Sequence, residues 1–349
     1  MSKALLSQKF KQSLIHQKLS DFISNSKEKL HFKGALGSSL TFSIATIFKS
    51  SDRPFLLIFD TKEEAAYYLN DFEMLLDDKE VLFYPGSYRR PYKIEETDNA
   101  NVLLRAEVLS RINSQKKPAL IVTYPEALFE KVVSRKQLEK STFKLAVGDT
   151  LSLDFFNEVL FEYQFSRVDF VTDPGEFSVR GGIVDVFSFS NDEPYRIEFF
   201  GDEVDSIRTF DVESQLSINI LKKIQILPNI EHKLLNETRQ SFLEYISVNT
   251  VIFAKDIPSF LATTDALQQK AIEAYGELSS AINHSRPEDL FCKSADFKLQ
   301  LLDFSVAEFG TNTLLAAQKT QEVELHVGPQ PSFNKQFNLL IEDLSLIHI

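Results

Sequence analysis

The sequence contains no tryptophan, only two methionines and a single cysteine, Cys292, in 349 residues. One cysteine cannot form an intrachain disulfide, which fits the reducing conditions of a cytoplasm. No histidine motif accompanies Cys292, so we interpret it as a partly buried apolar residue and not as a nucleophile. Without tryptophan, the 31 phenylalanines must supply most of the aromatic volume of the core.

Long apolar runs and an excess of basic residues are also absent. No stretch of about 18 apolar residues occurs, and the N-terminal segment has no apolar core of signal-peptide length, so we expect a cytoplasmic protein without a membrane span. The chain has 38 lysines and arginines against 50 aspartates and glutamates, a net charge of −12. Proteins that neutralise many phosphates are normally basic, which argues against tight unaided binding to nucleic acid.

Strand-like and helix-like segments alternate in two parts of the chain. The segments with short apolar runs typical of buried strands are 55–60, 80–86, 119–125, 223–228 and 249–256. The segments with helical patterns are 7–30, 62–76, 97–113, 233–247 and 257–283. This alternation predicts an α/β fold with a parallel sheet.

Residues 143–221 differ in texture and in charge. Short alternating runs separated by turn residues indicate antiparallel strands and hairpins. The segment holds 16 acidic and 5 basic residues, so its net charge of −11 accounts for nearly all the excess negative charge. We therefore predict one α/β domain, formed by 1–142 and 222–330, that is interrupted by a small β-rich domain at 143–221. Residues 331–349 are predicted to be a linker and the truncated start of a next domain, with a strand at 338–344.

Two blocks of the β-rich segment carry a family resemblance: DPGEFSVRGGIVDVF at 173–187 and PYRIEFFGDEVDSIRTFDVESQ at 194–215. Both closely resemble the second domain shared by UvrB and bacterial transcription-repair coupling factors, and 84–109 resembles the first domain of the coupling factors. The resemblance implies the N-terminal, UvrB-like region of a coupling factor. That region recruits UvrA to RNA polymerase stalled at DNA lesions, in nucleotide excision repair.

The resemblance also implies parts that this sequence lacks. One is an RNA-polymerase-binding domain, and another is a motor that uses ATP and magnesium to translocate on duplex DNA. A further absent C-terminal domain is expected to contact the β-rich domain intramolecularly and to cover it. We therefore expect this segment to hold no cofactor of its own and to carry no catalysis.

UvrB has a phosphate-binding loop of the form G-x-x-x-x-G-K-[ST], and the matching segment here reads Gly34-Ala35-Leu36-Gly37-Ser38-Ser39-Leu40-Thr41. The lysine of that motif supplies the positive charge that meets the β- and γ-phosphates, and Leu40 cannot do so. Ser39 also restricts a backbone that must approach phosphate closely. We interpret Gly34, Gly37, Ser39, Leu40 and Thr41 as a degenerate phosphate loop, kept as the scaffold of a helicase-like α/β domain.

The strand predicted at 195–200 separates two kinds of side chain. Alternation places Ile197 and Phe199 on one face, and Arg196, Glu198 and Phe200 on the other. Arginine and aromatic residues are enriched in interaction hot spots. By resemblance, Arg180, Arg196 and Phe200 match the positions that contact UvrA. The alternative for Arg180 is a local ion pair with one of the many nearby carboxylates.

Two other functions compete with this interpretation. A UvrB-type, ATP-dependent damage-verification helicase is opposed by Leu40, and a nucleic-acid-binding domain is opposed by the net charge. The stretch Tyr88–Tyr92 combines basic and aromatic residues, as in proteins that clamp single strands, but we interpret it as a surface loop. The acids Asp202, Glu203 and Asp205 are interpreted as a solvated hairpin face, and the scattered histidines predict no zinc site.

Overall fold

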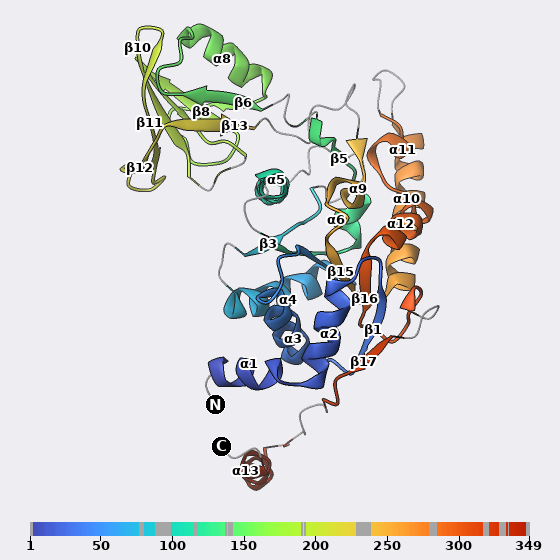
Figure 1. The fold of residues 1–349 in the computed structure, drawn as a ribbon. Coiled ribbons are helices and arrows are strands. Elements are labelled where there is room, and N and C mark those ends of the chain that lie inside the picture. The colour runs from blue at the N-terminus through green and yellow to red at the C-terminus, as the bar shows by residue number, and fades with distance from the viewer. Residues whose placement is uncertain are drawn as a thin grey trace.

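The computed structural model describes residues 3–76, 80–87, 99–114, 118–136, 138, 142–189, 191, 193–227, 239–278, 285–316, 321–327, 333 and 335–346. The larger part of the molecule is built on a seven-stranded sheet in which every neighbouring pair is parallel (Figure 1). Its strands, in their order across the sheet, are β17 (Glu322–Glu324), β1 (Lys29–Lys33), β16 (Ser305–Glu308), β15 (Val251–Ala254), β2 (Phe55–Ile58), β4 (Leu120–Thr123) and β3 (Val81–Phe83). The predicted parallel α/β fold is confirmed.

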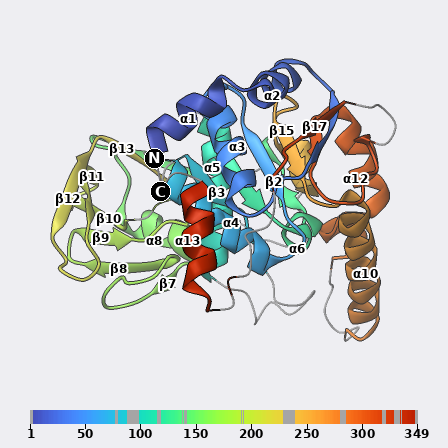
Figure 2. The same cartoon turned by 90° about the horizontal axis from the view of Figure 1, so that it is seen from below.

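Helices cover both faces of this sheet (Figure 2). One group comprises α1 (Lys3–Lys11), α2 (Leu14–Ser24), α3 (Ser38–Phe48) and α4 (Lys62–Leu75). The other comprises α5 (Asn99–Ser114), α6 (Pro125–Phe129), α9 (Phe242–Tyr245), α10 (Ile257–Gly276), α11 (Pro287–Leu290), α12 (Ser294–Gln300) and the short 3-10 helix Leu301–Asp303. Side chains cap the N-termini of several of these helices. At the start of α4 the Thr61 hydroxyl accepts from the Glu64 amide at 3.2 Å. At the start of α10 the Asp256 carboxylate accepts from the Ser259 amide at 2.9 Å.

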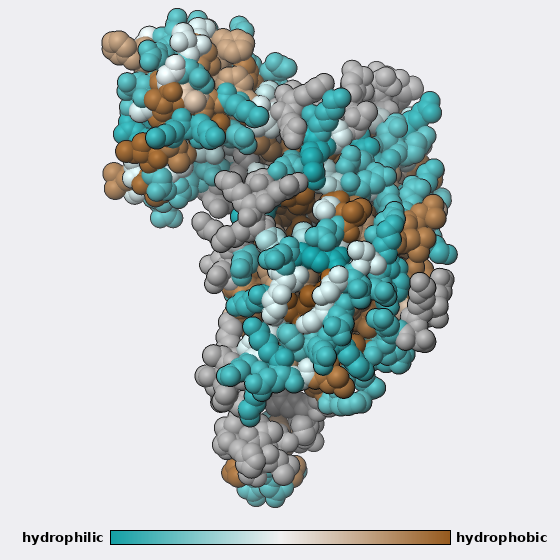
Figure 3. All heavy atoms as spheres, viewed as in Figure 1, coloured by the Kyte–Doolittle hydropathy of each residue, from teal (hydrophilic) through white to brown (hydrophobic). Residues whose placement is uncertain are grey.

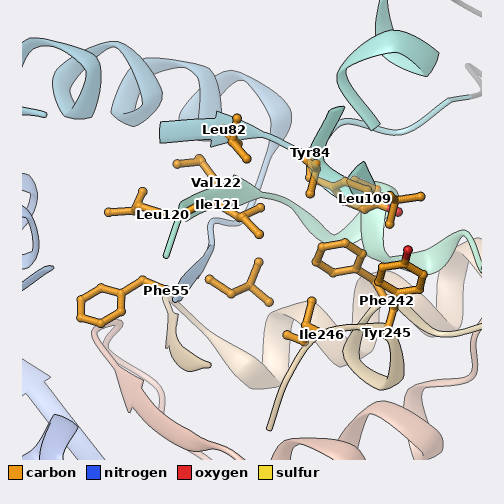
Figure 4. Close-up of a cluster of buried hydrophobic side chains, with 14 of the residues drawn as sticks. Phe55, Leu82, Tyr84, Leu109, Leu120, Ile121, Val122, Phe242, Tyr245 and Ile246 are labelled. Carbon is orange, nitrogen blue, oxygen red and sulfur yellow. The ribbon is translucent and has the colours of Figure 1, made fainter. Parts of the chain in front are cut away.

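The core of the larger part lies where β2, β4 and β3 meet α5 and α9 (Figure 4). Aliphatic side chains of the strands fill one side of it, and the stacked rings of Tyr84 and Phe242, with centroids 4.0 Å apart, fill the other. Beside this pair, the fully buried guanidinium of Arg105 lies 4.5 Å from the Tyr84 ring and 3.4 Å from the Glu130 carboxylate. Glu130 in turn accepts from the Ser87 hydroxyl at 2.6 Å, so a buried polar network fixes the chain where β3 ends.

A six-stranded sheet forms the smaller part of the molecule, which Figure 1 shows beside the large sheet. Its strands, in order, are β12 (Ser217–Leu221), β11 (Glu203–Phe210), β10 (Tyr195–Phe200), β9 (Ile183–Val186), β8 (Glu176–Arg180) and β7 (Ser166–Arg167). All pairs are antiparallel except β7 with β8. The β-rich insertion expected from the alternating runs is confirmed. Helix α8 (Leu153–Glu162), which the sequence pattern did not single out, buries Phe156, Val159 and Leu160 against its inner face.

Two short ladders complete the structure. Strand β6 (Phe143–Ala146) pairs with β13 (Lys223–Ile226), so the chain enters and leaves the small sheet through one antiparallel pair. Strand β5 (Val132–Val133) pairs with β14 (Arg239–Gln240) near α9. No helix among the described residues is long and apolar enough to cross a bilayer.

Several predicted elements were wrong. The helix expected at 7–30 is two helices followed by β1, because Ser13 caps α2 by accepting from the His16 amide at 3.1 Å. The strand expected at 338–344 is instead helix α13 (Phe337–Leu346), since a short apolar run does not by itself distinguish a strand from a helix. Of the helix expected at 233–247, the four residues of α9 are helical. Residues 228–238 and 88–98, which include the start of the helix expected at 97–113, lie outside the described residues.

Cys292 gives the first testable prediction. Burial raises the pKa of its thiol from the ordinary value of 9.0 to about 12. Above pH 9 the thiol ionises in the unfolded chain but stays protonated in the folded one, so this residue lowers the free energy of unfolding as pH rises towards 12. Between pH 8 and 10.5 the loss approaches about 2 kcal/mol. Urea unfolding of Cys292→Ala should therefore show a shallower alkaline decline than the wild type. Equal declines in the two proteins would contradict the burial of the thiol.

Candidate functional site

Strand β10 presents opposite kinds of side chain to its two faces. Ile197 and Phe199 are buried against the core, and Phe200 is 84% exposed. The pairing register shifts between Ser206 and Val204, because the extra residue Asp205 forms a bulge in β11. The bulge keeps both Ile207 and Val204 facing inward, so the inner face stays apolar to the end of the hairpin. The predicted partition of this strand into a buried and an outward face is confirmed.

One buried carboxylate organises the outward face. Asp185 of β9 is 1% exposed and lies directly opposite Arg196 of β10 in the ladder. Arg196 donates from Nε to Oδ1 at 2.7 Å and from Nη2 to Oδ2 at 2.9 Å. Arg180 of β8 donates to the same Oδ2 atom. The structure thus brings together two of the three predicted contact residues around a carboxylate that the sequence prediction did not single out.

Aromatic rings support both guanidinium groups. The Cζ atom of Arg196 lies 4.3 Å from the centroid of the Phe210 ring, and that of Arg180 lies 5.3 Å from the centroid of Phe170. Phe210 belongs to a small buried cluster on this face with Val171 and Phe187. These contacts fix the arginine side chains in position, so little conformational entropy remains to be lost when a partner binds.

Arg196 is more enclosed than an outward position in a strand implies. Its side chain is 16% exposed, because Gln215 accepts hydrogen bonds from it through the main-chain oxygen at 3.1 Å and through Oε1 at 3.2 Å. The hydrogen bond with Asp185 raises its pKa above the ordinary arginine value, so it stays charged. Arg196 and Phe200 thus share a face but differ in burial, because Arg196 is held by enclosed hydrogen bonds and Phe200 is 84% exposed.

The charge balance of this face differs from that of its surroundings. Arg180 and Arg196 share a single carboxylate, which leaves one positive charge uncompensated within the group. On the next strand Arg208 pairs with Glu198. The local ion pair that was the alternative for Arg180 does exist, with Asp185, yet the Arg180 side chain stays 39% exposed. A stripe of guanidinium groups thus crosses a segment whose net charge is −11, and it suits a partner that presents carboxylates.

Asp185 could have been recognised from the sequence by its neighbours. It stands between Val184 and Val186, both buried, so a lone acid interrupts an apolar run. A charge in such a position is costly unless it is paired, and this predicts a nearby arginine or lysine. Which basic residues pair with it depends on strand register, which adjacent strands set only in the folded sheet.

The glycine loop at the end of β1 leads directly into α3. Gly34 and Gly37 have φ angles of +69° and +51°, and Gly37 precedes the first helical residue, Ser38. Leu40 is buried in the core. The Ser39 hydroxyl donates to the Leu36 carbonyl at 2.7 Å and accepts from the Leu36 amide at 2.9 Å. The loop is therefore stabilised by its own hydrogen bonds, and Leu40 serves the packing of α3.

A cavity of about 640 Å³ lies beside this loop, and both lysines that line it pair with carboxylates. Lys33 lies 2.6 Å from Glu322, and Lys255 lies 3.1 Å from Asp60 and 2.7 Å from Glu64. Gly34 lies so close to the residue that follows β17 that a Cβ there would be 2.0 Å from the Leu325 carbonyl oxygen. Thr41 donates to the Ser38 carbonyl at 3.0 Å. Both lysines beside the cavity are thus paired with carboxylates.

Three acidic candidate residues lie on the surface of the small sheet. Asp202, Glu203 and Asp205 are exposed around the β10–β11 hairpin. Among the described residues, no group of three or more His, Cys, Asp or Glu side chains could hold a metal ion. Tyr88–Tyr92 lies outside the described residues.

The fold is that of a parallel α/β protein with a small, mostly antiparallel β-rich domain. Residues 143–232 match the model of the UvrB interaction domain family. The chain is similar to the transcription-repair-coupling factor of Bacillus subtilis (32% identical over 221 residues, 63% of this chain and 18% of the relative) and to that of Rickettsia bellii (31% over 224 residues, 64% and 20%). It is also similar to the UvrABC system protein B of Thermosipho africanus (28% over 210 residues, 57% and 32%).

These matches confirm the family resemblance seen in the sequence. They also show how limited its extent is, since the matched region spans about a fifth of the length of the two coupling factors. Two of these relatives are named transcription-repair-coupling factors, and the third is named as a protein of the UvrABC system.

The buried carboxylate gives the second prediction. Asp185→Asn should leave two guanidinium groups without their anionic partner, so we expect the small domain to lose roughly 3–5 kcal/mol of stability. Urea unfolding followed by circular dichroism measures the loss. Asp205→Asn, which neutralises an exposed carboxylate on the same sheet, is the matched control and should change stability by less than about 0.5 kcal/mol. Equal stabilities for the two variants would show that Asp185 does not organise this face.

Proposed function

We propose that this chain is the N-terminal module of a transcription-repair coupling factor and that its small sheet recruits UvrA in nucleotide excision repair. The match of 143–232 to the UvrB interaction domain and the similarity to coupling factors support this assignment. The RNA polymerase contact, the duplex DNA motor and the intramolecular cover over the β-rich domain belong, in this proposal, to parts of the relatives beyond the matched region.

The observation that carries the proposal is the outward face of β8, β9 and β10. Two arginines converge on one buried carboxylate, and a phenylalanine on the same face is almost wholly exposed. Arginine and aromatic residues held rigidly in this way supply binding energy at a low entropic cost. An acidic group of UvrA would meet the uncompensated positive charge, and an apolar recess of UvrA would take the Phe200 ring.

The proposal includes no catalysis by this module. Leu40 stands where a phosphate-binding lysine is needed, and the lysines beside the cavity pair with carboxylates. A UvrB-type helicase needs a working nucleotide site, so these residues favour an interaction role over that alternative. The net charge of −12 argues against an independent nucleic-acid-binding role.

The third prediction concerns UvrA binding. Phe200→Ala should weaken the affinity for UvrA by about 2 kcal/mol or more, the scale of a hot spot, and should leave the thermal melting temperature unchanged. Arg180→Ala and Arg196→Ala should weaken binding to a similar degree, and added salt should weaken the wild type more than either variant. Isothermal titration calorimetry with purified UvrA measures all three affinities.

Two comparisons control this experiment. Ile197→Ala removes a buried side chain three residues before Phe200 and should cost roughly 2–5 kcal/mol of stability as a core truncation. Arg196→Ala should also lower stability, because Asp185 then keeps Arg180 as its remaining arginine. If Phe200→Ala binds UvrA as tightly as the wild type does, the proposed surface is wrong.

The fourth prediction concerns ATP. Adding about 5 mM ATP with magnesium should not raise the melting temperature, because a ligand stabilises a protein only when its concentration approaches or exceeds its dissociation constant. Phosphate release should equal that of a buffer blank. Turnover above the blank that disappears in Thr41→Ala, and persists in the exposed control Ser38→Ala, would show a working nucleotide site.

A further inference from the structure

Strand β12 leaves an apolar edge uncovered on the small sheet. The segment 215–221 carries no charged residue, although the insertion around it has a net charge of −11. Ile220 is 88% exposed, and Leu216 and Ile218 are exposed as well. Figure 3 shows hydrophobic side chains gathered over β11 and β12. No described strand pairs with the outer edge of β12.

The ladder places Ile220 on the same face as the two arginines. Ile220 is opposite Arg208 of β11, and Arg208 is opposite Arg196 of β10. Residues directly opposite one another in a sheet point to the same face. The Asn219 side chain turns to the other face, where it lies 3.5 Å from the Thr209 hydroxyl. The row across the outward face therefore runs Asp185, Arg196, Arg208 and Ile220.

Sheet geometry gives the separations along this face. Ile220 lies two strands from Arg196, a distance of about 10 Å. Phe200 lies four residues from Arg196 along β10, a distance of about 13 Å. A protein interface of ordinary size covers about 800 Å² on each partner, a patch roughly 30 Å across. A partner that contacts Arg196 and Phe200 therefore extends over Ile220.

An exposed, uncharged edge strand is a hazard for a protein that is meant to stay monomeric. Natural sheets protect such edges with lysine, proline or a covering element. The described part of the chain places no strand over the outer edge of β12, so this edge is open to a partner. Covering an exposed isoleucine also removes more apolar area from water than covering a half-buried side chain, and so contributes more binding free energy.

We propose that Ile220, with β12 around it, is the apolar anchor of the surface that binds UvrA, beside the arginine row. The proposal rests on the proposed function, because it takes the partner of Arg196 and Phe200 as its occupant. The partner patch presents carboxylates opposite the arginines and an apolar group opposite Ile220. A second copy of this chain is the less favourable occupant, because two insertions of net charge −11 would face each other.

The experiment titrates UvrA into the 349-residue chain and into Ile220→Ala and Ile220→Gln. Glutamine keeps nearly the size of the side chain and removes its apolar character. Both variants should bind UvrA at least about tenfold more weakly, with unchanged melting temperatures. Ile272→Ala, which truncates an exposed isoleucine on α10 in the larger part of the molecule, is the matched control and should bind as the wild type does.

Phe200→Ala, measured in the same series, separates the two proposals. If it loses affinity while both Ile220 variants bind normally, the role of Ile220 is overturned and UvrA recruitment stands. If none of the variants loses affinity, recruitment through this face fails as well. Sedimentation equilibrium tests the other occupant: a wild-type dimer that Ile220→Gln dissociates, with unchanged UvrA affinity, would assign β12 to self-association and overturn the inference.

Discussion

The parallel pairing of β2 with β15 is the constraint on which the rest of the molecule depends. Phe55 lies opposite Val251, and Ile58 lies opposite Ala254. The centre of the large sheet therefore joins a segment that precedes the small sheet in the sequence to a segment that follows it. That pairing brings the two ends of the insertion together. The β6–β13 ladder follows from it, because both connections must leave the larger part at neighbouring points.

Within the small sheet, the arrangement of the outward face depends on the side chain of Asp185. Asp185 is buried on the outward face, and an unpaired charge there would be costly. Two arginines from the neighbouring strands satisfy it and are thereby held in place on rings of their own. The same ion pairs that stabilise the sheet also fix the positions of the two guanidinium groups, of which that of Arg180 is the more exposed. Stability and recognition are therefore coupled at Arg196, and they are separate at Phe200.

The cavity beside the glycine loop lies at the carboxyl end of β1, where open parallel sheets commonly bind ligands. Here a glycine loop leads into α3, and the lysines beside it form internal ion pairs. Lys255 lies between Asp60 and Glu64, and Leu40 faces the core. The arginine face of the small sheet and the glycine loop of the large one thus differ in charge balance: two arginines share one carboxylate on the first, whereas both lysines beside the second pair with carboxylates.

The sequence by itself determined the fold class, because continuous apolar runs indicate buried parallel strands and alternating apolar and polar residues indicate a half-exposed antiparallel sheet. It also determined the two faces of β10, since Ile197 and Phe200 differ in parity. It did not reveal β1, β16 and β17, whose short runs become strands only beside partners that are distant in the chain. Nor did it assign Asp185 to Arg180 and Arg196, or place Ile220 in line with them. Only the tertiary structure decided those pairings, because strand order and register arise from contacts between segments and not from the residues of any one segment.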